Sequence, residues 1–185
     1  DLLQLTKNIA DEQKVDENNL LPDPMQPYFR VERWLNIDND WTVTTVVQRI
    51  APASGSVNFQ LPLIEGESVF TRGVRVSDNK VEGTILSGQM SVRWESTLEK
   101  SSEITLTAGD IRDWAEVWRV STSPRWHIET AGLKPVLDAS VAPSGVPSNV
   151  PSWKPWGGES LVLMFTKPKA AEGDVQTIQE LRLTH

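Results

Sequence analysis

Apolar and polar residues alternate with a period of two through most of the chain from Tyr28 onward. Val57, Phe59 and Leu61, for example, are separated by Asn58 and Gln60. This pattern is typical of strands in an antiparallel sheet with one buried face. Similar runs occur at 74–76, 90–94, 104–106 and 161–165, and turn residues separate them: Asn39-Asp40, Ser54-Gly55, Asp78-Asn79, Ser87-Gly88 and Ala108-Gly109. The sequence therefore predicts an all-β fold, an antiparallel, jelly-roll-like β-sandwich.

The 185 residues suit one domain with appendages. We expect residues 28–185 to form a single β-sandwich domain. We expect residues 1–27 to form an arm or a short helix, because Leu2, Leu5 and Ile9 make a weak helical stripe that the prolines after it cannot continue.

Five prolines fall within residues 133–158, which predicts a long Pro-rich loop. The chain then returns to the same sandwich through strands at 159–167 and 176–184. Between Asp110 and Val120 the pattern fits both a helix and a strand. We favour a strand from about Glu116, preceded by a short helical turn. Pro124 then interrupts, which fits an edge or a bulge.

The composition excludes several classes of function. The chain has no cysteine, which rules out disulfides and thiolate sites. Its net charge of −7 argues against a nucleic-acid surface. No apolar run is long enough to span a membrane.

Catalytic patterns are weak, and we expect neither an enzyme nor a cofactor or metal. Asn36, Asp38 and Asp40 lack the glycine and the final glutamate of a calcium loop. His127 has no recognisable triad partners. Paired strand carboxylates could still support a glycoside hydrolase-like enzyme, which is the second alternative function. The candidates are Glu32, Glu95, Asp113, Glu116 and Glu129.

Eight tryptophans are the most unusual feature of the composition. Trp34, Trp94, Trp118 and Trp126 each adjoin an arginine. Neighbours within a strand face opposite sides, so any arginine–indole stacking must cross between strands. Burial of one indole contributes up to about 4–6 kcal/mol, several times the value of an exposed stacking contact, so core packing is the favoured interpretation.

Trp153 and Trp156 lie in the Pro-rich loop, between Pro151 and Gly157. Two indoles held by prolines can form a flat platform for a sugar ring or a partner's side chain. A carbohydrate-binding module that uses Trp153, Trp156 and Trp41 is therefore the first alternative function. The alternative without a ligand is a loop that folds over the open end of the sandwich, with both indoles packed against it.

Four segments of the chain carry a resemblance to known proteins: Phe29-Arg30-Val31-Glu32-Arg33-Trp34-Leu35, Asp38-Asn39-Asp40-Trp41, Glu116-Val117-Trp118-Arg119-Val120 and Pro124-Arg125-Trp126-His127. They resemble the Trp-rich β region of a family of large, uncharacterised, membrane-anchored proteins of Gram-negative bacteria. The resemblance covers about residues 28–132 and implies a periplasmic location, a fragment of a longer chain and membrane attachment through regions outside it. We therefore expect a non-catalytic structural or interaction module of an envelope protein, with a protein or an envelope polysaccharide as partner.

Overall fold

The computed structural model describes residues 25–110, 112–137, 140–141, 147–148 and 150–167. This part of the chain is all-β and mostly antiparallel, with no helix. The predicted N-terminal helix or arm therefore lies outside the described residues apart from 25–27, and the strand predicted at 176–184 lies wholly outside them.

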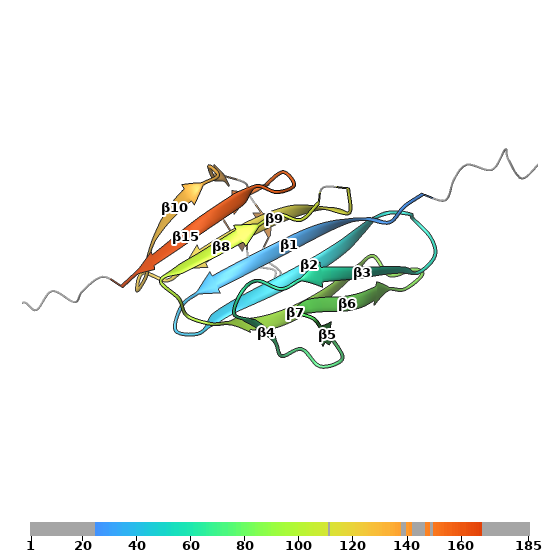
Figure 1. The fold of residues 1–185 in the computed structure, drawn as a ribbon, viewed down its shortest axis with the longest axis horizontal. Helices are drawn as coiled ribbons and strands as arrows, with labels where there is room; N and C mark the ends of the chain where they lie inside the picture. Colours follow the sequence, from blue (N-terminus) through green and yellow to red (C-terminus); the bar gives the residue numbers. More distant parts are fainter. Residues whose placement is uncertain (1–24, 111, 138–139, 142–146, 149, 168–185) are drawn as a thin grey trace, which may run out of the picture.

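The largest sheet has seven strands in the order β11-β14-β9-β1-β2-β7-β4. Figure 1 labels β9, β1, β2, β7 and β4 of this sheet. Its centre is the hairpin of β1 and β2, joined at Asp38–Asp40 as the turn signal predicted. The strands are β1 (Tyr28–Ile37), β2 (Trp41–Ala51), β4 (Glu67–Val69), β7 (Ser91–Leu98), β9 (Trp114–Thr122), β11 (Val136–Leu137) and β14 (Pro151–Trp153).

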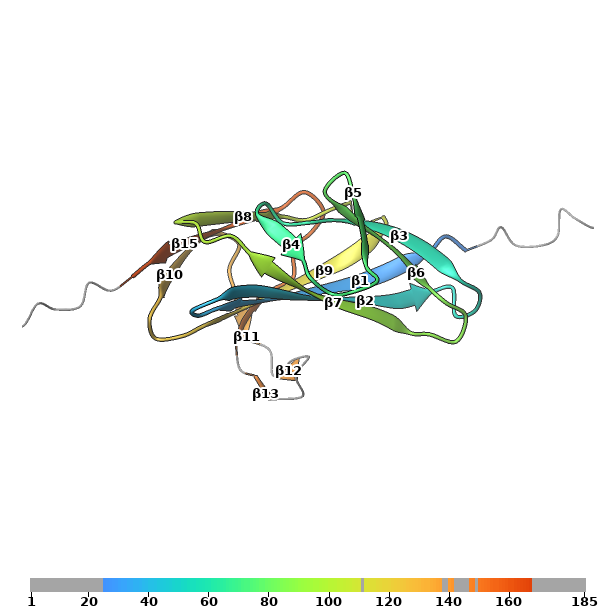
Figure 2. The same cartoon turned by 90° about the horizontal axis from the view of Figure 1, so that it is seen from below.

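Two three-stranded sheets cover one face of the large sheet (Figure 2). We call them the β8 sheet and the β3 sheet. The β8 sheet comprises β10 (His127–Gly132), β15 (Ser160–Thr166) and β8 (Glu103–Thr107), in that order. The β3 sheet comprises β3 (Val57–Pro62), β6 (Lys80–Ile85) and β5 (Arg75–Ser77). A two-stranded ladder joins β12 (Ser140–Val141) to β13 (Pro147–Ser148).

Each covering sheet has its own hydrophobic cluster against the large sheet. Trp41, Leu161 and Leu163 lie in the cluster under the β8 sheet. Phe59 and Trp94 lie in the cluster under the β3 sheet. The alternating residues that predicted the strands at 57–61 and 161–165 are the residues buried here, so the prediction of one apolar face per strand is confirmed.

A row of buried polar side chains separates the two clusters. Along β1, Arg33 lies between Val31 of one cluster and Leu35 of the other. Along β9, Glu116 likewise lies between Trp114 and Trp118. Thr45 of β2 and Ser96 of β7 repeat the pattern, and both are fully buried. This polar row marks the line along which the two covering sheets part.

One strand pair departs from the antiparallel prediction. β9 runs parallel to β1, with Phe29 opposite Trp114 and Ile37 opposite Thr122. A hairpin enforces antiparallel pairing, but a long connection does not. Between β2 and β9 the chain builds all of the β3 sheet and part of the β8 sheet, so it can return to β1 in either direction.

The Pro-rich segment is not wholly a loop. Residues 151–153 form β14, which pairs with β9, and β11 pairs with β14 at the edge of the large sheet. Pro151 is tolerated because it is the first residue of a short strand. β9 begins at Trp114, slightly earlier than predicted, after a turn closed by the Asp113 and Trp114 amides on the Asp110 carbonyl. The strand after Pro124, β10, is an edge strand, as the proline indicated.

Candidate functional site

The structure does not form the predicted two-indole platform. Trp153 is 2% exposed and Trp41 is 1% exposed, and both belong to the cluster under the β8 sheet. Trp153 is drawn inward because β14 pairs with β9 opposite Trp118, and its indole donates to the Leu133 carbonyl at 3.2 Å. Trp156 alone of the three is accessible, at 69% exposure. Ligand binding at Trp156 stays a prediction, whereas Trp153 and Trp41 offer no indole face to solvent.

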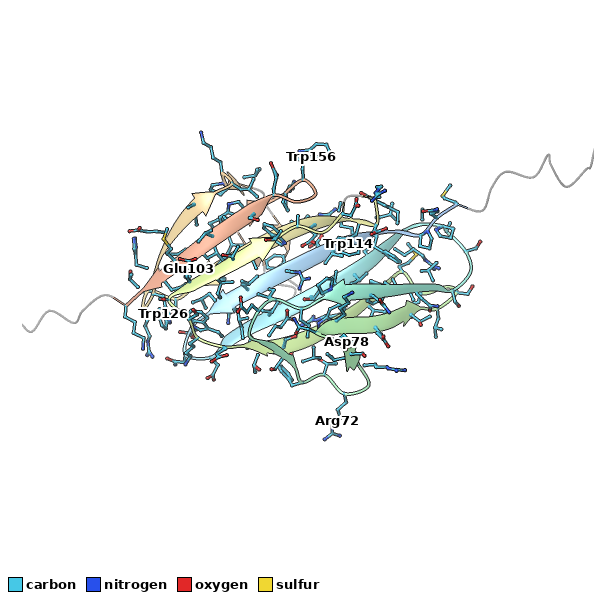
Figure 3. All side chains as sticks on the ribbon, viewed as in Figure 1. Arg72, Asp78, Glu103, Trp114, Trp126 and Trp156 are labelled. Atoms are coloured by element: carbon cyan, nitrogen blue, oxygen red, sulfur yellow. The ribbon has the colours of Figure 1, made fainter. Side chains whose placement is uncertain are left out.

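Trp41 instead supports another tryptophan. Its ring packs edge-on against Trp126, with centroids 5.1 Å apart, and tilted against Phe165 at 4.5 Å. Trp126 is only partly buried and lies at the rim of this cluster. Figure 3 places Trp126 near the end of the molecule where β15 finishes, away from Trp156. Core packing is thus confirmed for Trp34, Trp94 and Trp118, while Trp126 keeps part of its ring accessible.

The parallel pair brings two distant turns together around Trp126. Because β1 and β9 run in the same direction, the turn after Ile37 and the turn after Thr122 lie at the same edge. The Ser123 amide donates to the Ile37 carbonyl at 3.0 Å, and the Trp126 indole donates to the Asp38 carbonyl at 3.0 Å. Arg125 donates to the side-chain oxygen of Asn39. Trp126 and Arg125 are therefore positioned by the β1–β2 turn.

Two further segments complete this end of the molecule. β7 runs in the direction of β1, so its following turn, which carries Lys100, reaches the same edge. The end of β15 is tied to that turn by the Phe165 amide, which donates to the Ser102 carbonyl at 2.9 Å. Together these segments enclose a hollow of about 400 Å³, which we call the loop-end hollow. Its lining includes Asp38, Asn39, Lys100, Arg125, Trp126 and Lys167.

The loop-end hollow combines an indole with an excess of positive charge. Three cationic side chains line it against one carboxylate, that of Asp38. The Lys167 amine lies 4.9 Å from the centroid of the Trp126 ring, a cation–π contact that orients the amine. The hollow therefore offers a ligand one partly buried aromatic ring beside several charged groups, and its volume lies within the usual range for small-molecule sites.

Among the carboxylates named as catalytic candidates, Glu116 is the most buried, and both of its oxygens are engaged within the core. One carboxylate oxygen accepts from the Gly109 amide at 3.0 Å and from the Trp114 indole at 2.8 Å. The other accepts from the Trp118 indole at 2.7 Å and lies 3.7 Å from Arg33 Nε. Arg33 also lies 3.5 Å from Glu67, another buried carboxylate. These contacts hold the polar row together and engage both oxygens of Glu116 with donors of the protein itself.

Three of the remaining carboxylates named as catalytic candidates lie beside basic side chains. Glu32 contacts Arg30 at 2.9 Å and Arg119 at 2.8 Å, and Glu95 contacts Arg93 at 2.6 Å. Glu129 lies 3.7 Å from His127, and both side chains are more than 60% exposed. Asp113 is exposed in the turn before β9, where its backbone carbonyl accepts from the Phe29 amide. The structure therefore gathers none of these residues around a shared substrate position.

The Arg-Trp sequence pairs combine across the parallel strands. Arg33 lies opposite Trp118, and Trp34 lies opposite Arg119. The Arg119 guanidinium lies over the Trp34 ring, 4.7 Å from its centroid. Cross-strand stacking therefore occurs at this pair, and it occurs between buried residues, so that stacking and core packing act together.

A larger hollow of about 770 Å³ lies beside β6 and β7. Phe59 and Trp94 stack in its wall with ring centroids 6.3 Å apart and an angle of 12° between them. Its polar residues already satisfy one another: Arg75 pairs with Glu82 at 3.0 Å, and Thr84 donates to Asn58 at 2.8 Å. These residues bring no unpaired charge to a ligand, so the loop-end hollow is the stronger candidate site.

One carboxyl group has a strongly shifted pKa, and it lies outside both hollows. Hydrogen bonds from the Arg112 side chain and amide lower the pKa of Asp110 from 3.8 to about 2.

Within the described ranges, no group of three or more histidine, aspartate or glutamate side chains could hold a metal ion. No helix among those residues is long and apolar enough to cross a membrane.

Sequence reasoning missed Trp126 as a site residue. The available signal was that Asp38-Asn39-Asp40 and Pro124-Arg125 are both turn sequences directly after long strands. Only the parallel pairing of those strands brings the two turns together, and the alternation pattern does not report strand direction.

No protein-family model matches the chain, and no curated protein is significantly similar to it.

Proposed function

We propose that this chain is a non-catalytic interaction module of a bacterial envelope protein, and that it binds an envelope polysaccharide at the loop-end hollow. One observation carries the proposal. Four chain segments converge on Trp126, which is held by the Asp38 carbonyl and remains partly accessible beside three cationic side chains. Loops presented by a rigid sheet scaffold are the usual place for binding residues.

The placement in the envelope rests on the resemblance between the Trp-rich segments of this chain and a family of membrane-anchored proteins. Two of those segments, around Asp38 and around Arg125, meet in the loop-end hollow. We place the module in the periplasm, attached to the membrane through regions outside this chain. We further propose that its two packed layers form a jelly-roll-like β-sandwich. The tryptophan that we propose as the polysaccharide contact is therefore Trp126, in place of Trp153 and Trp41.

A hydrolase receives less support from the same residues. Retaining and inverting glycosidases need two carboxyl groups that flank one substrate bond. Glu116 is occupied by three hydrogen bonds, and Glu32 and Glu95 are occupied by arginines. A binding role needs no such pair.

The proposal is tested by native gel electrophoresis through gels that contain purified envelope polysaccharides. A polysaccharide that binds retards the protein relative to a gel without it. Trp126→Leu removes the ring but keeps an apolar side chain against Trp41, and Arg125→Gln removes an exposed charge without touching the core. Trp156→Leu is the matched control, because it removes an indole that is 69% exposed and lies outside the hollow.

We expect the wild type and Trp156→Leu to be retarded equally, and Trp126→Leu and Arg125→Gln to be retarded less. Urea unfolding of each variant separates lost binding from lost folding, and Arg125→Gln should unfold as the wild type does. Retardation that survives both loop-end substitutions, or that disappears in Trp156→Leu, would overturn the assignment of the site.

A further inference from the structure

We infer that the loop-end hollow selects an anionic saccharide, a sugar that carries a carboxylate or a phosphate group. The inference rests on the proposed function, since it names the class of polysaccharide bound at the same site. It is carried by the charges that line the hollow and by how each of them is held.

The local charge opposes the charge of the whole chain. The chain carries a net charge of −7, yet Lys100, Arg125 and Lys167 line the hollow against Asp38 alone. Lys100 also borders a neighbouring hollow that is lined by Glu65, Glu99 and Glu103. These acidic side chains offset part of the positive charge that Lys100 brings to the loop-end hollow. Arg125 and Lys167 share the lining of the hollow with one acidic residue, Asp38.

Within the described ranges, no carboxylate forms an ion pair with these cations. Most of the other described arginines lie against carboxylates: Arg75 lies against Glu82 at 3.0 Å, for example, and Arg119 against Glu32 at 2.8 Å. No ion pair of this kind involves Lys100, Arg125 or Lys167 among the residues that the structure describes. Their charges are therefore available to a ligand.

The two main cations are positioned by neutral groups. Arg125 donates to the Asn39 amide oxygen, and Lys167 lies over the Trp126 ring at 4.9 Å. A guanidinium has five N–H donors, so one bond to Asn39 leaves donors free for an oxyanion. Holding a cation with an amide and an indole limits its motion without cancelling its charge, which reduces the ordering cost of binding.

The test is a titration of the wild type by calorimetry with four probes. They are a trisaccharide of galacturonic acid, the neutral trisaccharide of galactose, glucose 6-phosphate and inorganic phosphate. Arg125→Gln and Lys167→Gln are compared with Lys80→Gln, a control on the exposed hairpin between β5 and β6, outside the hollow. Each titration is repeated between about 0.05 M and about 0.5 M NaCl, because salt screens exposed charges.

We expect the galacturonate trisaccharide to bind about tenfold more tightly than the galactose trisaccharide. Each charge removed from the hollow should weaken that binding about two- to fivefold, since an exposed ion pair contributes up to about 1 kcal/mol. Lys80→Gln should bind as the wild type does, and added salt should weaken the acidic probe alone. Binding of glucose 6-phosphate would show that the site accepts a sugar phosphate as well as a sugar carboxylate.

The outcomes separate this inference from the proposed function. Equal affinity for the acidic and neutral trisaccharides would refute anion selectivity and leave polysaccharide binding intact. Inorganic phosphate as tight as the acidic trisaccharide would refute the saccharide part and indicate a plain anion site. If no probe binds and the polysaccharide gels do not retard the protein, both the inference and the proposed function are wrong.

Discussion

Arg119 lies with its guanidinium carbon 4.7 Å from the centroid of the Trp34 ring, directly across the parallel pair of β9 and β1. The Arg119 side chain is only 3% exposed, and it also contacts Glu32 at 2.8 Å. One buried cation therefore serves an indole face and a carboxylate on the same neighbouring strand. This contact joins the two strands whose ends build the loop-end hollow.

Arg119→Lys tests that contact. Lysine keeps the charge but lacks the planar group that covers the indole. We expect the free energy of unfolding to fall by about 1–3 kcal/mol, because a desolvated cation–π contact and a charged hydrogen bond are both weakened. Urea unfolding measures the change. Arg75→Lys is the control, since its ion pair with Glu82 is largely exposed and should change stability by less than about 0.5 kcal/mol. Equal effects at the two sites would contradict the account.

Glu116→Gln tests whether this carboxylate is structural. Its two oxygens accept from three N–H donors, so an amide NH₂ at either position meets a donor. We expect a loss of about 3 kcal/mol in the free energy of unfolding, since the change also removes a partner of buried Arg33. Thermal and urea unfolding measure it, with exposed Glu129→Gln as the matched control. A Glu116→Gln protein as stable as the wild type would show that the polar row does not depend on this charge.

Gly83→Ala tests the packing beside the larger hollow. A Cβ atom at Gly83 would lie 2.3 Å from Cζ of Phe59, its partner across β3 and β6. We expect a loss of about 1–3 kcal/mol from the forced movement of the ring. Phe59→Leu should relieve the clash, so the double variant should be more stable than the sum of the two single changes predicts. Additive losses would mean that the Phe59 ring is not the cause of the loss in Gly83→Ala.

The ion pair of Asp110 and Arg112 makes a prediction about pH. The folded pKa of Asp110 is about 2 against an ordinary value of 3.8, so the contact stabilises the fold above about pH 4 and is lost as the pH falls towards 2. NMR titration of the Asp110 carboxyl group should give this low pKa in the wild type. In Arg112→Gln the pKa of Asp110 should rise towards 3.8, because the hydrogen bonds from the arginine side chain are lost. A pKa that stays low in the variant would assign the shift to another cause.

Much of the strand framework follows from the sequence. Residues 57–61 and 161–165 bury their alternating apolar side chains as the pattern requires, and the turns at Asn39-Asp40 and Asp78-Asn79 lie where the signals indicated. Period-two alternation reports which face of a strand is buried, but it carries no information on which strand lies beside it or in which direction.

The candidate site depended on that missing information. Trp126 and Asp38 are far apart in the sequence and meet only because β1 and β9 are parallel neighbours. The prediction that Trp153 is exposed was wrong for a related reason. Its prolines indicate a loop, yet the free edge of β9 was available for pairing and drew residues 151–153 into the sheet. In both cases a tertiary contact with β9 decided the outcome over the local signal.

The indole N–H signals of the protein test the central claim most directly, because the chain has eight tryptophans and each gives one signal. A ¹⁵N-correlation spectrum is recorded while the galacturonate trisaccharide is added, with each signal assigned by a Trp→Phe substitution. The account predicts that the Trp126 signal shifts most, that Trp41, 5.1 Å away, shifts less, and that Trp153 and Trp156 do not move. A shift of the Trp156 signal with Trp126 unchanged would contradict it and return the binding site to the Pro-rich segment.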